Sequence, residues 1–172
     1  FLEQSCSHHP GSLDRLLNEE IFVYANIPYR IRSIEEIVAN PKDTIVFDWD
    51  LNSKIDDLIG STGSDGALLR RADGEVHRVN LMEKIICSLL AKLVNFIPGA
   101  GIWLNTQRPE WNDANNALVG NGTSVVTLCY LKRSLSFWIS RLEDSSVKEF
   151  RLSDEISSLL DRVNVVLESY RH

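Results

Sequence analysis

The residues best suited to chemistry stand close together between Thr106 and Gly120. This stretch carries two carboxylates, a guanidinium, several amides and an indole, and apolar helical patterns precede and follow it. Apolar burial does not require such a mixture, whereas loops held by rigid elements are where binding and catalytic residues concentrate. An indole beside amides and carboxylates suits a sugar ring, which has an apolar C–H face and a rim of hydroxyls. We therefore expect the functional centre of the chain in this stretch.

Asp113 is the candidate general acid for cleaving a glycosidic bond, a reaction that needs a proton for the leaving oxygen and a nucleophile at the anomeric carbon. Inverting hydrolases place an acid and a base about 6.5–9.5 Å apart, with a water between them. Because an Asp with an ordinary pKa of about 3.9 is ionised at neutral pH, burial or a second negative charge has to raise the pKa of the acid. Trp111 can provide the burial and Glu110 the charge. Arg108, Glu110, Trp111, Asn112 and Asn116 are the expected substrate-binding residues.

The run Trp111-Asn112-Asp113, followed by Ala114 and Asn116, resembles the W-N-D-A-x-N signature of the cellobiose phosphorylase family, over residues 101–122. Members of that family are inverting disaccharide phosphorylases built on an (α/α)6 toroid. The resemblance implies that Asp113 is the general acid and that Trp111 and Asn112 line the sugar site. It also implies inorganic phosphate as a co-substrate and no other cofactor. Glu110 stands where many members have Asp, and the Arg and His that bind phosphate in the family have no match here.

Each of these residues also has a structural interpretation. Asp113 can cap a helix that starts at Ala114, and Trp111 can anchor a core. Arg108 can form a surface ion pair of little energetic value, and Asn116 can form a turn. The alternatives to a glycoside hydrolase or phosphorylase are therefore a non-catalytic sugar-binding or structural segment and an ordinary helical interaction domain.

Composition sets further expectations. With 172 residues, of which 44% are hydrophobic, residues 1–172 can form a single mainly helical domain or a fragment of a larger catalytic domain. The net charge of −6 and the scattered basic residues argue against nucleic-acid binding. No apolar run reaches the length of about 18 residues that a membrane span needs. We expect a saccharide substrate, with the remainder of a longer chain or a second copy as partner. The cysteines Cys6, Cys87 and Cys129 favour the cytoplasm as reduced, buried thiols.

Several helices are expected from apolar spacing and capping residues. Their starts are Ser12, with a helix to about Tyr24; Ser33, with a capping box; Asn80, with Glu83 in the capping-box position and a helix to Ile97; Thr123 or Ser124; and Ser153. The helix from 123 to 142 is apolar most of the way round, which predicts a buried position such as the inner ring of a toroid. The expected fold class is therefore mainly α, with antiparallel helix pairs forming part of an (α/α)6 toroid and a small β-hairpin insertion at 68–77.

Two other stretches have chemical interpretations. An apolar strand over Thr44–Phe47 precedes Asp48-Trp49-Asp50-Leu51-Asn52, which resembles the nucleophile motif of haloacid-dehalogenase-type phosphatases and also a Ca²⁺ loop. The simpler expectation is an acidic connection with Trp49 packed inward. His8-His9 can bind metal, but no further ligand stands at a suitable spacing, so no metal site is expected.

Overall fold

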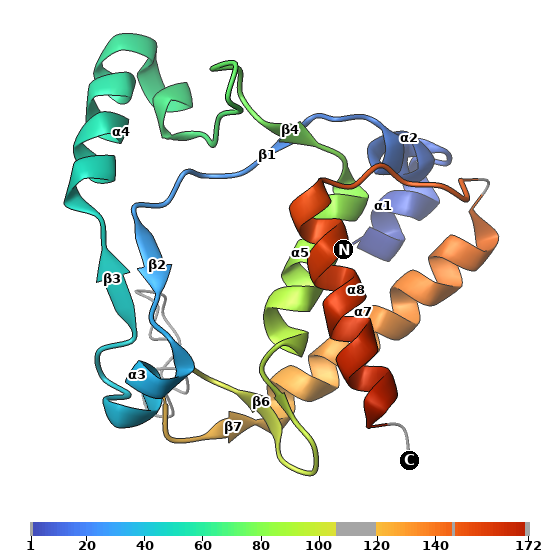
Figure 1. The fold of residues 1–172 in the computed structure, drawn as a ribbon. Coiled ribbons are helices and arrows are strands. Elements are labelled where there is room, and N and C mark those ends of the chain that lie inside the picture. The colour runs from blue at the N-terminus through green and yellow to red at the C-terminus, as the bar shows by residue number, and fades with distance from the viewer. Residues whose placement is uncertain (1, 106–119, 146, 171–172) are drawn as a thin grey trace. The chain divides into compact units, whose positions relative to one another are not determined.

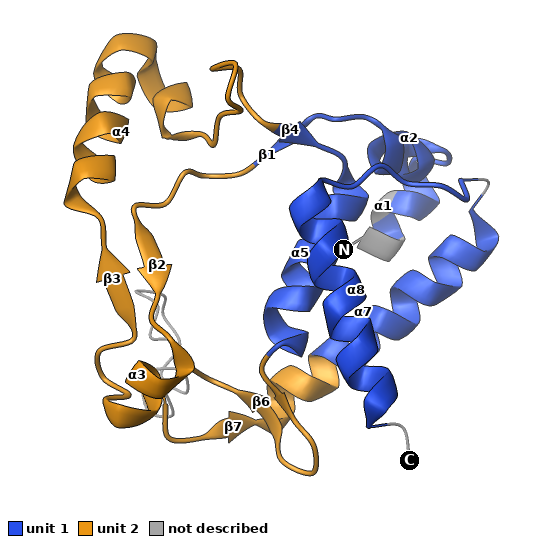
Figure 2. Cartoon of the chain, viewed as in Figure 1, with its two compact units in different colours: residues 1–23, 78–94, 131–172 blue, residues 24–77, 95–130 orange. Residues whose placement is uncertain are grey.

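The computed structural model describes residues 2–105, 120–145 and 147–170. The chain divides into two compact units, which Figure 2 shows in different colours. Unit 1 consists of residues 1–23, 78–94 and 131–172, and unit 2 consists of residues 24–77 and 95–130. Each unit is assembled from segments that are distant in sequence, so pairing between those segments defines it.

Unit 1 is mainly helical, and Figure 1 labels its elements. Strand β1 pairs with β4 in an antiparallel arrangement that places Phe22 opposite Val79. In chain order the elements are α1 (Leu2–His8), α2 (Ser12–Asn18), β1 (Phe22–Val23), β4 (Arg78–Val79), α5 (Leu81–Leu93), the part of α7 (Val125–Asp144) from residue 131 onward, and α8 (Asp154–Ser169).

Unit 2 contains two further antiparallel sheets. One is the pair β2–β3, and the other has the strand order β5-β6-β7. Its elements are β2 (Tyr29–Ile31), α3 (Ile34–Ala39), β3 (Ile45–Phe47), α4 (Trp49–Thr62), the 3-10 helix η1 (Gly63–Ala67), β5 (Phe96–Ile97), β6 (Gly101–Trp103), β7 (Thr123–Ser124) and the first turns of α7.

The expected fold class, a mainly α chain of antiparallel helix pairs from an (α/α)6 toroid, is wrong. Helices share the described residues with three small antiparallel sheets, so the fold is mixed α/β. Strands of two or three residues such as β1 and β3 are too short to give an alternating pattern. They form because backbone groups from distant segments pair with one another, and helical periodicity does not report such pairing.

The core of unit 1 joins three helices that the sequence separates widely. Leu17 of α2, Met82 of α5 and Trp138 of α7 are all buried and in contact. Partly buried apolar side chains pack around them, namely Leu13, Leu81, Ile85, Ile86, Phe137, Leu142, Phe150 and Leu152. The apolar stripe expected on the helix after Asn80 is therefore the face of α5 that packs into this core.

Asn80 caps α5 as predicted. Its Oδ1 accepts a hydrogen bond from the backbone N–H of Glu83 at 2.9 Å, which satisfies one of the free donors at the start of the helix. The other end of the same amide donates from Nδ2 to the carbonyl oxygen of Arg151 at 2.8 Å. One side chain thus caps α5 and fixes the chain that leads into α8.

Glu83 does not complete the capping box expected with Asn80. Its side chain is 2% exposed and accepts hydrogen bonds from the backbone N–H of Ser153 at 2.7 Å and from its hydroxyl at 2.9 Å. Ser153 is the N-cap residue of α8. The carboxylate therefore lies beside the N-termini of both α5 and α8, where the helix dipoles favour a negative charge.

This contact also fixes how the two helices run. Because Glu83 joins the N-terminus of α5 to that of α8, the helices lie side by side with the same direction (Figure 1). The sequence predicted antiparallel pairs of helices joined by short loops, whereas this pair is distant in sequence and runs parallel. Packing between α5 and α8 leaves Val165 and Val166 exposed on α8.

Two helices end earlier than expected because strands take their last residues. The helix expected to reach Tyr24 ends at Asn18, and Phe22-Val23 pair with β4 instead. The helix expected to reach Ile97 ends at Leu93, and Phe96-Ile97 pair with β6. In both cases tertiary pairing outweighs a favourable helical pattern.

Helix α7 begins after Ser124, as predicted, but it is not buried all round. Leu131 and Trp138 are buried, whereas Val126 and Tyr130 are each 66% exposed and Ile139 is 57% exposed. The inner-ring expectation is therefore wrong. Cys129 is also exposed, against expectation, and Cys87 is half-buried; all three cysteines are free.

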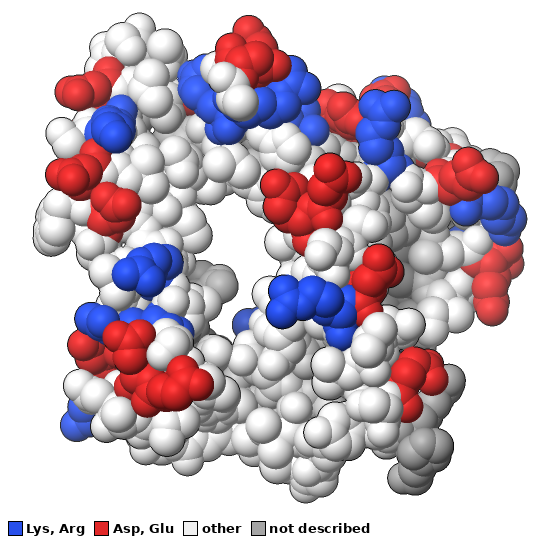
Figure 3. All heavy atoms as spheres, in the orientation of Figure 1, with Lys and Arg blue, Asp and Glu red and all other residues white. Residues whose placement is uncertain are grey.

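Other local predictions are confirmed. Ser33 and Glu36 form the expected capping box at the start of α3. An antiparallel bridge between Arg70 and Val76 forms the hairpin expected around Asp73-Gly74. None of the described helices is long and apolar enough to cross a membrane. On the face drawn in Figure 3, basic and acidic side chains occur in separate small groups with uncharged residues around them.

Replacing Glu83 by Ala is expected to lower the free energy of unfolding by about 1–3 kcal/mol, because two donors of Ser153 lose a charged acceptor. Glu83→Gln should lie between the wild type and Glu83→Ala, since its amide oxygen can accept only one of the two hydrogen bonds well. Urea unfolding measures the effect. Glu149 is an exposed Glu of the same unit, and Glu149→Ala should change stability by no more than about 0.5 kcal/mol. Equal losses for the Glu83→Ala and Glu149→Ala variants would contradict this role.

Candidate functional site

All six predicted site residues, Arg108, Glu110, Trp111, Asn112, Asp113 and Asn116, lie outside the described residues. Their roles therefore remain predictions. The structure does describe both ends of the segment that contains them, up to Asn105 and from Gly120. Both ends belong to unit 2.

Backbone hydrogen bonds join the two ends of this segment. Strands β6 and β7 pair through Ile102 with Ser124 and through Trp103 with Thr123. The pairing extends outward, because Leu104 donates its N–H to the carbonyl of Gly122 at 3.2 Å and accepts from the N–H of Gly120 at 2.7 Å. The described residues on the two sides of 106–119 are thus hydrogen-bonded to each other.

Asn95, just after α5, supports the outgoing end. Its backbone carbonyl accepts from the N–H of Trp103 at 2.7 Å. Its side-chain Oδ1 accepts from Nδ2 of Asn105 at 2.8 Å. Asn105, the last described residue before the segment, is therefore held by a side-chain contact and directly follows Leu104, whose backbone bonds to Gly120 and Gly122.

Gly120 supports the returning end through a close packing contact. Its φ is +69°, a left-handed conformation that favours glycine, and a Cβ built there would overlap Cβ of Pro41. Pro41 follows α3, so the connection between α3 and β3 lies directly against Gly120, the first described residue after 106–119. No side chain other than hydrogen fits this position without displacing Pro41.

A hollow of about 590 Å³ lies at the start of α4 in the same unit. Its lining includes Tyr29 and Arg30 of β2, Phe47 of β3, and Asp48, Trp49 and Asp50. Trp49 is 75% exposed, so the expectation that it packs inward is wrong. The stretch is also no simple connection, because Trp49 begins a helix of 14 residues. The sequence does contain a signal for this helix, which the prediction of a simple connection overlooked. It is an N-cap at Asp48 followed by Leu51, Ile55 and Leu58 at helical spacing.

Asp48 and Asn52 have structural partners within α4. Oδ1 of Asp48 accepts from the N–H of Leu51 at 2.9 Å and caps the helix. Nδ2 of Asn52 donates to Oδ2 of Asp56 at 2.9 Å. The Ca²⁺-loop interpretation is therefore wrong, since these residues belong to a helix instead of a loop around an ion. Among the described residues no three metal-ligating side chains gather, His8 and His9 included.

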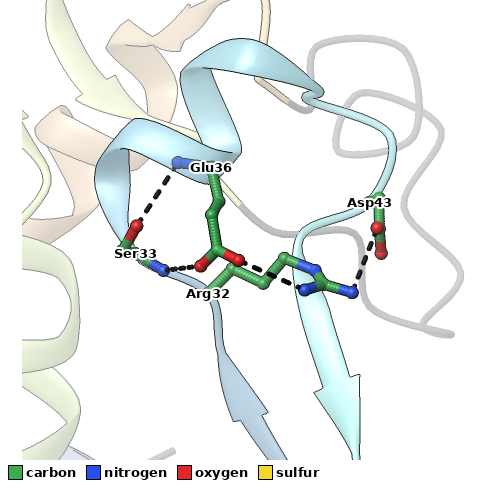
Figure 4. A network of polar contacts seen from close by, with 4 residues as sticks. All are labelled: Arg32, Ser33, Glu36 and Asp43. Carbon is green, nitrogen blue, oxygen red and sulfur yellow. Dashed lines mark hydrogen bonds and ion pairs between the residues drawn. The ribbon is translucent and has the colours of Figure 1, made fainter.

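In the connection that runs from β2 through α3 to β3, an ion-pair network joins α3 to the residues on either side of it, as Figure 4 shows. The guanidinium of Arg32 contacts Glu36 at 3.4 Å and Asp43 at 3.1 Å. The backbone N–H of Ser33 donates to Glu36 at 3.0 Å, and this hydrogen bond is the main cause that lowers the pKa of Glu36 below its ordinary value of 4.5. The network fixes the turn that carries Pro41.

Comparison with models of known protein families finds no match for this chain, and comparison with curated proteins finds none either.

Gly120→Ala is expected to destabilise the chain more than Gly99→Ala. Both glycines have a left-handed φ, +69° and +77°, but a Cβ at Gly99 would meet nothing within 4 Å. The left-handed conformation alone costs an Ala about 1–2 kcal/mol, and the overlap with Pro41 should add about 1–3 kcal/mol. Thermal unfolding of both variants measures the difference. Equal melting temperatures would show that Gly120 and Pro41 are not in close contact.

Acid is expected to weaken the capping box at α3. The pKa of Glu36 is lower in the folded chain than its unfolded value of 4.5. Its contribution to stability is therefore fully present above pH 4.5 and is lost as pH falls through the folded pKa. A carbon-detected NMR titration should find the pKa of Glu36 below 4.5. In Glu36→Gln this part of the acid dependence of unfolding should be missing; an unchanged acid dependence would contradict the assignment.

Proposed function

We propose that this chain is part of a carbohydrate-active enzyme that cleaves or phosphorolyses glycosidic bonds by an inverting mechanism, with Asp113 as the general acid. The observation that carries the proposal is the sequence of residues 108–116, where an acid, an indole, a guanidinium and amides gather. The hydrogen-bonded ends at Leu104 and Gly120 support it, because a functional segment needs a rigid base.

The proposed roles follow from what each group can do for a sugar. Asp113 donates the proton to the leaving oxygen, and the indole of Trp111 stacks on the C–H face of the ring. Asn112 and Asn116 exchange hydrogen bonds with hydroxyls. Arg108 holds an anionic or hydroxyl oxygen, and the charge of Glu110 helps to keep Asp113 protonated.

The nucleophile distinguishes the two reaction types. A phosphorylase uses inorganic phosphate as co-substrate and needs only the acid from the protein, whereas an inverting hydrolase also needs a general base. The substrate class is an oligosaccharide or disaccharide in both cases. A cytoplasmic location, with three free cysteines, is part of this proposal, as is a partner in the form of further chain or a second copy.

Saccharide binding without turnover is the second candidate. It is supported by the exposed Trp49 in the hollow at α4, since an exposed indole can stack on a sugar ring while the neighbouring carboxylates accept hydrogen bonds from its hydroxyls. This candidate predicts affinity for saccharides and no release of sugar or sugar phosphate.

Asp113→Asn should reduce turnover by about 10²–10⁴-fold, because the amide keeps the shape but has no proton to donate. The measurement is release of sugar or sugar phosphate from a disaccharide, with and without phosphate. Substrates with an activated leaving group should be partly spared. Trp111→Ala should instead raise KM as well as lower kcat, since it removes a stacking surface.

Asp57→Asn is the matched control, because Asp57 is an exposed Asp on α4. Its turnover should equal that of the wild type. Unchanged turnover in Asp113→Asn would make Asp113 a structural residue and would sink the catalytic proposal.

A further inference from the structure

The exposure of Trp49 is unexpected on physical grounds. It is 75% exposed at the first position of α4, although the indole is among the largest apolar side chains. Helix formation does not require it there, since Asp48 supplies the cap. Its neighbour Phe47 is 38% exposed and Ile27 is 50% exposed, so apolar surface gathers around it. A concave surface of this kind, lined by aromatic and apolar groups with a few polar ones, is typical of a ligand site.

Three aromatic side chains, Tyr29, Phe47 and Trp49, line the hollow. Tyr29 and Phe47 are direct partners in the β2–β3 pairing, so their side chains lie on the same face of that sheet. The rings of Phe47 and Trp49 have centroids 4.5 Å apart at an angle of 57°. The hollow measures about 590 Å³, within the range of about 300–1,000 Å³ that is usual for small-molecule sites.

The polar lining supplies both donors and acceptors. Arg30 and the Trp49 N–H donate, Asp48 and Asp50 accept, and the Tyr29 hydroxyl does both. Among the described residues, neither Arg30 nor Asp50 forms an ion pair. Of the three charged groups of the lining, Arg30 and Asp50 are thus available to a ligand, while Asp48 caps α4.

This mixture selects against simple ions. An anion such as phosphate would meet the two carboxylates, and a cation would meet the guanidinium of Arg30. A neutral ligand with many hydroxyls satisfies both kinds of group, because each hydroxyl donates and accepts. Its C–H faces can cover the indole.

We propose that the hollow at α4 is a saccharide-binding site separate from the Asp113 segment, with Trp49 as its stacking platform. The ligand class rests in part on the proposed function, since a carbohydrate-active chain gains from a second contact with the same polymer. Such a site raises effective concentration at the catalytic segment without taking part in the reaction. Asp48, engaged as a helix cap, holds the rim of the site in place.

Calorimetric titration of the whole chain with cellotetraose, xylotetraose and maltotetraose tests the proposal. At least one of these neutral oligosaccharides should bind, and Trp49→Ala should weaken that binding at least tenfold, as truncation of a central aromatic contact does. Trp49→Phe, which keeps an aromatic plane, should lose less. Tyr170 is the matched control, because it is 74% exposed and lies outside the hollow and in unit 1. Tyr170→Ala should bind like the wild type.

The same titrations in Trp111→Ala separate this proposal from the catalytic one, because that variant removes the stacking surface of the Asp113 segment. Retained binding in Trp111→Ala together with loss in Trp49→Ala supports a separate site. Unchanged binding in Trp49→Ala overturns it, whatever the turnover assay shows. Failure of all three oligosaccharides to bind also overturns it, as does binding of choline or inorganic phosphate that Trp49→Ala abolishes.

Discussion

Unit 1 depends on the buried carboxylate of Glu83, which satisfies the N-terminus of α8 while belonging to the first turn of α5. Burying a carboxylate is costly unless hydrogen bonds and nearby positive potential compensate. Here two donors of Ser153 and the N-terminal ends of two helices provide that compensation. The consequence is a parallel helix pair that is joined at the N-termini of α5 and α8. In unit 2, Asn95 supports Trp103 and Asn105 through its backbone and side-chain oxygens.

The backbone hydrogen bond between Gly120 and Leu104 has a comparable role in unit 2. It is made by backbone groups, so it does not depend on the side chains within residues 106–119. Substitutions within residues 106–119 can therefore change the chemistry of the segment without breaking the hydrogen bonds beside it. The glycines next to those hydrogen bonds, by contrast, tolerate few substitutions. Gly101 has φ +136°, and a Cβ on it would lie 2.9 Å from the carbonyl oxygen of Ser124. The sheet that closes the segment therefore requires glycine where its strands approach most closely.

Features set by neighbouring residues could be predicted from the sequence. The Ser33–Glu36 capping box, the Asn80 cap and the start of α7 each follow from a few adjacent side chains. Features set by distant partners could not. The sequence predicts Phe22-Val23 as the end of a helix, because it does not show that Arg78-Val79 pairs with them. It predicts Glu83 as part of a local capping box, because it does not show that Ser153 lies beside it. For the candidate site, the sequence showed the residue types of 106–119. It did not indicate that backbone hydrogen bonds join the residues on either side of this segment, nor that Trp49 is exposed.

The two proposed saccharide contacts differ in what their carboxyl groups can do. A carboxyl that delivers a proton at neutral pH has to be shielded from water. Asp48 and Asp50 are exposed, and Asp48 is committed to the start of α4. They are suited to accepting hydrogen bonds from hydroxyls, which a solvated carboxylate does well and reversibly. The two proposals therefore give proton donation to Asp113, and the holding of a sugar to Tyr29, Phe47 and Trp49. Both stretches belong to unit 2, where Pro41, in the connection between α3 and β3, packs against Gly120, the first described residue after residues 106–119.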